Sequence, residues 1–132
     1  MADLVKPDLS KHRILVVEDE ALIAFEVGDI IKTAGGTVAG PFATVDEALR
    51  IIESENISAA ILDMELWEDT SLFLARRLSD KNIPFLFYTA HSDKIDVWGA
   101  AEIVKKPATS ATLVSALAGL ISKNFTQPAT QL

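Results

Sequence analysis

Five short apolar runs, separated by stretches with helical periodicity, limit the folds open to this chain. The runs cover residues 13–17, 37–40, 57–62, 83–88 and 101–104, and the second is the weakest and ends at Pro41. Short runs with little polar alternation are typical of strands buried on both faces. Strands that alternate with helices favour a parallel sheet. The sequence therefore predicts an α/β fold, a doubly wound, flavodoxin-like five-stranded parallel sheet with helices on both faces.

The intervening stretches predict the helices. One helix begins at Ala21 and ends before Gly35-Gly36, and the next has the capping-box pattern Thr44-Val45-Asp46-Glu47 at its start. A third follows the polar loop 67–70. Residues 92–97 favour at most a short helix, and the last helix begins after a capping hydroxyl at Thr109 or Ser110.

Length and composition restrict the class of protein. The 132 residues suit one domain, for which we expect a flexible leader at 1–12, a folded region at 13–123 and a flexible tail at 124–132. The chain has no cysteine, no signal-peptide pattern and no apolar run long enough for a membrane span, so we expect a cytoplasmic protein without membrane insertion. A net charge of −7 without a basic stripe argues against direct nucleic-acid binding.

Polar residues follow four of the five predicted strands. Glu18, Asp19 and Glu20 follow the first, Asp63 the third, Thr89 the fourth and Lys106 the fifth. Ligands of open α/β sheets bind at the carboxyl ends of the strands, so these side chains are expected to meet. Taken singly, the acids suit a helix N-terminus, the threonine a loop and the lysine an exposed surface.

Together these residues have the chemistry of phosphoryl transfer. Converging carboxylates repel one another, and Mg²⁺ relieves that repulsion by binding their oxygens. A lysine and a hydroxyl can stabilise a phosphoryl group. Asp63 is then the nucleophile that becomes an aspartyl-phosphate.

The chain resembles the receiver domain of two-component response regulators over roughly residues 13–122. The matching segments are Ile14 to Glu20, Ile61 to Asp63, Tyr88 to Ala90 and Val104 to Pro107. The resemblance implies that Asp63 accepts a phosphoryl group from a histidine kinase or a phosphotransfer protein. It further implies that Asp19, Asp63 and the backbone carbonyl of Glu65 hold Mg²⁺, that Glu18 acts through a water, and that Thr89 and Lys106 contact the phosphoryl oxygens.

Three features depart from the usual receiver pattern. Leu66-Trp67-Glu68-Asp69 replaces the usual proline and glycine after the phosphorylated aspartate, Ile103 stands where an aromatic switch residue is usual, and the connection from Thr89 to Lys106 is short. These departures resemble atypical receivers of alphaproteobacteria. They affect the usual coupling between the threonine and the aromatic switch residue, and the usual output face of the domain. The residues needed for phosphorylation are unchanged.

Other functions compete with this one. A haloacid-dehalogenase-type phosphatase also uses a strand-end aspartate, but it needs a further acidic pair, and no acid follows Lys106. A nucleotide binder needs a glycine- or hydroxyl-rich phosphate loop, which Glu18-Asp19-Glu20 does not provide. A receiver-like docking module that is not phosphorylated is the third alternative.

The resemblance implies a stand-alone signalling domain that catalyses its own phosphotransfer and dephosphorylation, rather than an enzyme. We expect no attached effector domain. Three outputs stay open: an unknown downstream protein, a homodimer, or service as a phosphate sink. Glu65 lies two positions after Asp63, and His91 lies two positions after Thr89. Both are candidates for controlling how fast water attacks the aspartyl-phosphate.

Overall fold

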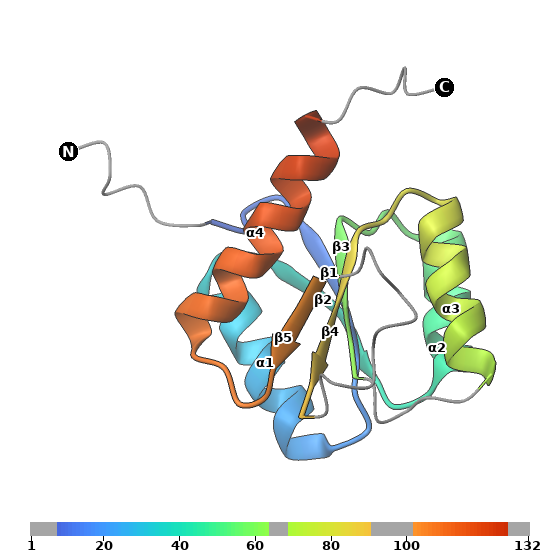
Figure 1. Ribbon diagram of the computed structural model, residues 1–132, viewed down its shortest axis with the longest axis horizontal. Helices are drawn as coiled ribbons and strands as arrows, with labels where there is room; N and C mark the ends of the chain where they lie inside the picture. The colour runs from blue at the N-terminus through green and yellow to red at the C-terminus, as the bar shows by residue number, and fades with distance from the viewer. Residues whose placement is uncertain (1–7, 64–68, 91–101, 127–132) are drawn as a thin grey trace.

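The computed structural model describes residues 8–63, 69–90 and 102–126. Its centre is a five-stranded parallel sheet with the order β2-β1-β3-β4-β5 (Figure 1). The predicted parallel sheet is confirmed. The strands are β1 Arg13–Val17, β2 Thr37–Phe42, β3 Ala59–Leu62, β4 Phe85–Thr89 and β5 Glu102–Lys105.

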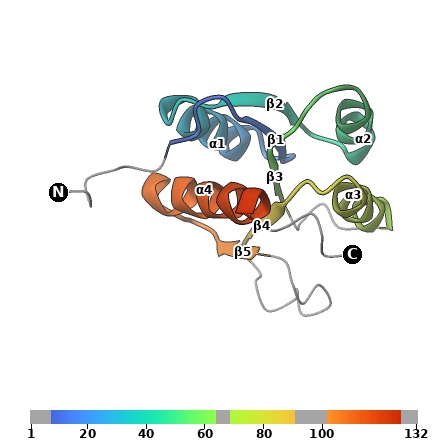
Figure 2. The same ribbon diagram turned by 90° about the horizontal axis from the view of Figure 1, so that it is seen from above.

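The described helices cover both faces of the sheet. α1 (Ala21–Thr33) and α4 (Ser110–Thr126) lie on one face, and α2 (Val45–Ser54) and α3 (Asp69–Asp80) lie on the other (Figure 2). Alternate residues of β1 therefore enter different cores, because successive strand side chains point to opposite faces. Ile14 packs with α1 and α4, whereas Leu15 packs with α2 and α3. The short helix predicted at 92–97 lies outside the described residues.

β2 is longer than the sequence indicated. Pro41 was expected to close this strand, yet β2 continues to Phe42. The register shifts between Leu15 and Val17, which identifies a bulge at Gly40 and Pro41, opposite the single residue Val16. A proline is tolerated in an edge strand at a bulge, because no ladder hydrogen bond from its nitrogen is needed there.

The helix caps follow the predicted residues. The Thr44 hydroxyl accepts a hydrogen bond from the Glu47 backbone nitrogen at 3.3 Å and donates one to the Glu47 carboxylate at 3.1 Å. At the start of α4, the Thr109 hydroxyl accepts from the Thr112 nitrogen at 3.1 Å. These bonds satisfy backbone donors that a helix N-terminus leaves unpaired.

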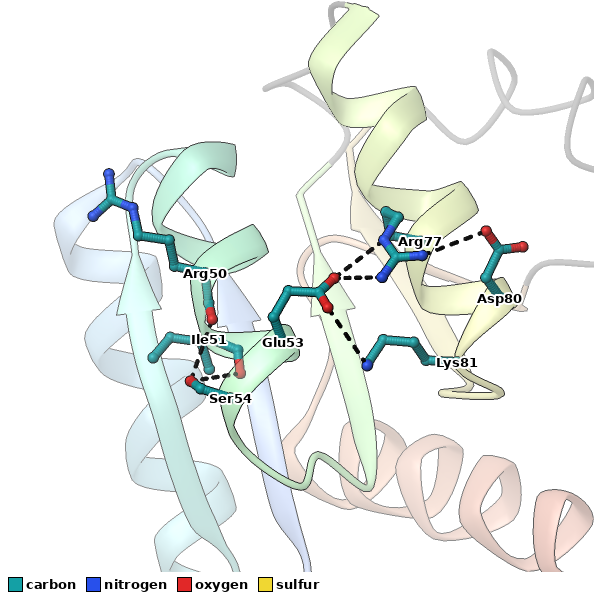
Figure 3. A network of polar contacts seen from close by, with 7 residues as sticks. All are labelled: Arg50, Ile51, Glu53, Ser54, Arg77, Asp80 and Lys81. Atoms are coloured by element: carbon teal, nitrogen blue, oxygen red, sulfur yellow. Dashed lines mark hydrogen bonds and ion pairs between the residues drawn. The ribbon is translucent and has the colours of Figure 1, made fainter.

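α2 and α3 are joined near their C-terminal ends by a charged network (Figure 3). The Arg77 guanidinium donates to the Glu53 carboxylate through Nε at 3.1 Å, and Lys81 Nζ lies 3.8 Å from the same carboxylate. The hydrogen bond from Arg77 holds the pKa of the Glu53 carboxyl below its ordinary value. The three side chains are between 31% and 49% exposed, so solvent screens the network and it adds little to stability.

Residues at both ends of the expected domain belong to the folded structure. Leu9, which the sequence placed in a leader, is 0% exposed, and its nitrogen donates to the Ala34 carbonyl at 3.0 Å. α4 continues to Thr126, so the first residues of the expected tail are helical. Among the residues that the structure describes, no helix is both long enough and apolar enough to cross a membrane.

Candidate phosphoacceptor site

The carboxyl ends of the parallel strands bring the predicted residues to one edge of the sheet. Glu18 directly follows β1, Asp63 follows β3, Thr89 ends β4, and Lys106 follows β5. β1, β3, β4 and β5 are consecutive neighbours in the sheet. In a parallel sheet the carboxyl ends of all strands lie at the same edge, so residues that follow different strands come close together. The observed sheet is parallel, as this prediction required.

Asp63 is buried at the centre of this edge. Asp63 is 2% exposed. Its backbone nitrogen donates to the Val17 carbonyl at 3.0 Å, which extends the pairing of β1 and β3. Lys106 Nζ lies 3.4 Å from Asp63 Oδ1 and 3.2 Å from Glu18 Oε1. A lysine that reaches two buried carboxylates offsets part of the cost of removing them from water.

Backbone and aromatic contacts hold Lys106 in this position. Its backbone nitrogen donates to the carbonyl of Thr89, which is fully buried, at 2.8 Å. Its Nζ lies 5.6 Å from the centroid of the Tyr88 ring, within the range of a cation–π contact. The Tyr88 hydroxyl accepts a hydrogen bond from the Ala108 nitrogen at 3.2 Å, which fixes the segment after Lys106. β4 and β5 thus orient the lysine together.

Glu18 is the carboxyl whose pKa the site changes most clearly. Burial, followed by the hydrogen bond with Asp63, raises the pKa of Glu18 to about 7. The bond from the Glu20 backbone nitrogen to Glu18 Oε2, 3.1 Å long, and the contact with Lys106 act in the opposite direction. Near neutral pH, Glu18 therefore holds a proton for part of the time, and a bound cation would displace it.

A group of carboxylates at this edge has the donor chemistry that Mg²⁺ prefers. One carboxylate oxygen each from Glu18, Glu20 and Asp63 lies within 4.8 Å of the others. Magnesium binds oxygen ligands and relieves the repulsion between such carboxylates. The residues present fit a divalent cation.

The predicted ligand set and this acidic group share Glu18 and Asp63 and differ at three residues, Asp19, Glu20 and Glu65. Asp19, a predicted ligand, is exposed and lines a neighbouring cavity, and it is not a member of the group. Glu65, expected to contribute its backbone carbonyl, lies outside the described residues, as does His91. The site residues predicted from the sequence do not include Glu20, although its Oε1 lies 3.9 Å from Lys106 Nζ.

The local backbone explains why Glu20 joins this group. The chain bends at Asp19, and the backbone at Glu20 is extended, with φ of −85° and ψ of 112°. The Glu20 backbone nitrogen donates to Glu18 Oε2, which keeps the two residues close together. No local pattern in the sequence indicates this bend, so sequence reasoning missed Glu20.

Comparison with known proteins agrees with this geometry. The family model for the response regulator receiver domain matches residues 14–118. The DNA-binding response regulator MtrA of Mycobacterium tuberculosis is 28% identical over 131 residues, which cover 95% of this chain and 57% of MtrA. The chain spans between 57% and 58% of the length of the first curated relatives it matches.

Solved structures show the same fold. A response regulator receiver protein from Burkholderia phymatum superposes with a TM-score of 0.74 at 21% identity, covering 85% of this chain and 96% of that one. The response regulator TrrA from Thermotoga maritima, in complex with Mg²⁺-BeF, has a TM-score of 0.69 at 26% identity and covers 83% of this chain and 98% of its own. The receiver interpretation is thereby favoured over the haloacid-dehalogenase alternative. The chain belongs to the family of response regulator receiver domains, the signalling domains of two-component systems.

Proposed function

We propose that this domain accepts a phosphoryl group on Asp63 from a histidine kinase or a phosphotransfer protein. The observation that carries the proposal is the buried Asp63 carboxylate with Lys106 Nζ 3.4 Å from its Oδ1. A buried carboxylate held beside a lysine is costly as a structural feature alone. The same pair suits a carboxylate that receives a phosphoryl group whose oxygens the lysine then neutralises.

In the proposed step, a carboxylate oxygen of Asp63 attacks the phosphorus of a phosphohistidine. The new P–O bond forms as the P–N bond breaks, and the electron pair of that bond returns to the imidazole, which takes up a proton as needed. Lys106 and the Thr89 hydroxyl bind the phosphoryl oxygens. Water later attacks the acyl phosphate and releases inorganic phosphate, which restores the Asp63 carboxylate.

Magnesium is the proposed cofactor. When bound, it would neutralise the carboxylates and the oxygens of the incoming phosphoryl group. We propose Asp19, Asp63 and the backbone carbonyl of Glu65 as its direct ligands, with Glu18 acting through a water. The clustered carboxylates of Glu18 and Glu20 add negative charge that attracts the cation. The presence of Mg²⁺-BeF in the structure of the similar protein TrrA supports magnesium as the cofactor.

We propose three possible outputs of phosphorylation. The domain binds a downstream protein, it binds a second copy of the chain, or it serves as a phosphate sink that hydrolyses its phosphoryl group. Phosphorylation would draw Thr89 inward and reshape the segment after it. Ile103, which replaces the usual aromatic residue, is exposed on β5.

The DNA binding named for MtrA is not carried over, because this chain has a net charge of −7. We place the domain in the cytoplasm, where ATP-dependent histidine kinases act.

Acetyl phosphate with Mg²⁺ tests the proposal without any knowledge of the kinase. Intact mass measurement of the native chain is expected to show the addition of one phosphoryl group. The Asp63→Asn variant and a sample with excess EDTA are expected to show none. A native chain that gains no mass would instead support the docking-module alternative.

A further inference from the structure

The charge of Lys106 has to lie beside the phosphoryl oxygens on Asp63 if the proposed function holds, and the inference below rests on that function. A lysine carries a compact charge on a flexible stem, so the stem alone does not fix where the charge lies. A displacement of about 1 Å near reacting groups can slow a reaction about a hundredfold. The contacts that hold the Lys106 ammonium therefore affect the rate of transfer.

Three carboxylates contact this ammonium in the resting chain: Glu18 at 3.2 Å, Asp63 at 3.4 Å and Glu20 at 3.9 Å. Each of these contacts depends on negative charge. The reaction changes that charge, because Asp63 becomes an acyl phosphate and a bound cation would neutralise its neighbours. The carboxylates therefore do not give the ammonium one constant position from the start of the reaction to its end.

The ring of Tyr88 is a contact of another kind. Lys106 Nζ lies 5.6 Å from its centroid. The attraction arises from the quadrupole of the ring, which has no net charge, so neither phosphorylation nor a bound cation removes it. Tyr88 is 7% exposed and the lysine side chain is 8% exposed. A cation–π contact is strongest when it is shielded from water in this way.

Tyr88 is itself fixed at both ends of its side chain. Its backbone belongs to β4 and pairs with Val104 of β5. Its hydroxyl accepts a hydrogen bond from the Ala108 nitrogen at 3.2 Å. Ala108 lies two positions after Lys106, so one tyrosine contacts both the side chain of the lysine and the backbone just beyond it. A ring anchored at its base and its tip offers the ammonium a fixed surface.

We propose that Tyr88 is a positioning residue for phosphoryl transfer to Asp63. Its ring keeps the Lys106 ammonium beside Asp63 while the charges of the surrounding carboxylates change, so the phosphoryl oxygens meet a lysine that is already in place. Tyr88 acts on the reaction through Lys106. The competing explanation is that Tyr88 is purely structural and fills the core between the sheet, α1 and α4.

Four variants separate the ring from the space that it fills. Tyr88→Leu and Tyr88→Met remove the ring and keep an apolar side chain in the core. Tyr88→Phe keeps the ring and loses the hydroxyl, so it is the conservative variant. Phe87→Leu is the matched control, because it removes a fully buried ring from the neighbouring position of β4, which packs in the opposite core. Circular dichroism and urea unfolding establish which variants are folded, and either ringless variant suffices.

NMR of the metal-free, unphosphorylated chain measures the contact directly. Protons that lie over an aromatic ring are shifted upfield, so the Cε protons of Lys106 are expected upfield of those of the exposed Lys105. The signal is assigned by its loss in Lys106→Met. We expect the upfield shift in the native chain, in Tyr88→Phe and in Phe87→Leu, and its loss in both ringless variants.

Acetyl phosphate with saturating Mg²⁺, followed by intact mass measurement, determines the effect on the reaction. The ringless variants are expected to be labelled about tenfold more slowly than the native chain, the effect of losing one buried cation–π contact. Tyr88→Phe and Phe87→Leu are expected to stay within about threefold of the native rate, since both keep the ring beside the lysine.

The inference is overturned if the Lys106 signal is the same in the native chain and the ringless variants, or if those variants are labelled at the native rate. In either case the native chain is still labelled and the proposed function stands. Slowing by Phe87→Leu as large as that by Tyr88→Leu also overturns it, because loss of any ring from β4 would then have the same effect. A native chain that acetyl phosphate does not label refutes the proposed function, and the role of Tyr88 in transfer fails with it.

Discussion

Lys106 Nζ lies 3.4 Å from Asp63 Oδ1, and the lysine side chain is only 8% exposed. The same ammonium lies 3.2 Å from Glu18 Oε1 and 3.9 Å from Glu20 Oε1. One cation thus serves three carboxylates, and the pocket keeps an excess of negative charge. That excess attracts a divalent cation and makes the site sensitive to loss of the lysine.

Lys106→Met is expected to destabilise the metal-free domain. The change leaves Glu18 and Asp63 without this counter-cation, and removal of one partner of a buried ion pair costs about 3 kcal/mol. Urea unfolding at pH 8 in EDTA measures the free energy of unfolding, and added Mg²⁺ should recover part of the loss. Lys105→Met, at the exposed neighbouring residue, is the control and should change stability by no more than about 0.5 kcal/mol. Equal effects of the two substitutions would contradict this account.

The stability gained from Mg²⁺ is expected to increase with pH. Burial raises the pKa of Glu18 to about 7 from its ordinary value of 4.5, so the folded chain binds a proton that the unfolded chain releases. Without metal, Glu18 therefore contributes stability at low pH that is lost as pH rises through about 7. Mg²⁺ prefers the deprotonated site, so the rise in melting temperature on adding Mg²⁺ should be larger at pH 8 than at pH 6.

Glu18→Gln is the control for this pH dependence. The amide has no titrating proton, so the difference between pH 6 and pH 8 should shrink. A stabilisation by Mg²⁺ that is equal at both pH values in the native chain would contradict the raised pKa of Glu18.

Leu9→Ala is expected to destabilise the domain although Leu9 precedes the first strand. Leu9 is fully buried and packs in the core between the sheet, α1 and α4. Truncation of a buried leucine costs about 2–5 kcal/mol through lost burial and the cavity left behind. Chemical denaturation measures the loss, and Leu22→Ala, at a leucine that is 69% exposed, is the comparison. If the two variants unfold at the same urea concentration, the N-terminal segment does not contribute to the core.

Local sequence patterns predicted the sheet because its three central strands, β1, β3 and β4, are buried on both faces. Ile14 and Leu15 enter different cores, so no polar residue interrupts the run, and the run is visible in the sequence. The meeting of Asp63 and Lys106 followed from the parallel direction of their strands. Both predictions rest on a pattern that repeats along the chain, an apolar strand followed by polar residues at its carboxyl end.

Features that depend on a single long-range contact were not predictable in this way. The polar sequence around Leu9 conceals its burial, which results from packing against core residues of the sheet, α1 and α4. The extension of β2 past Pro41 depends on its position at the edge of the sheet, which no local pattern states. The inclusion of Glu20 depends on the conformation of the connection between β1 and α1, which bends at Asp19.

The central claim is that Asp63 is the residue that carries the phosphoryl group. After reaction with acetyl phosphate and Mg²⁺, borohydride reduction converts a phosphorylated aspartate into homoserine, and peptide mass spectrometry locates it. The account predicts homoserine at position 63, in the peptide that follows β3, and its absence when EDTA replaces Mg²⁺. Reduction at Asp19 or another acid, or at none, would contradict it.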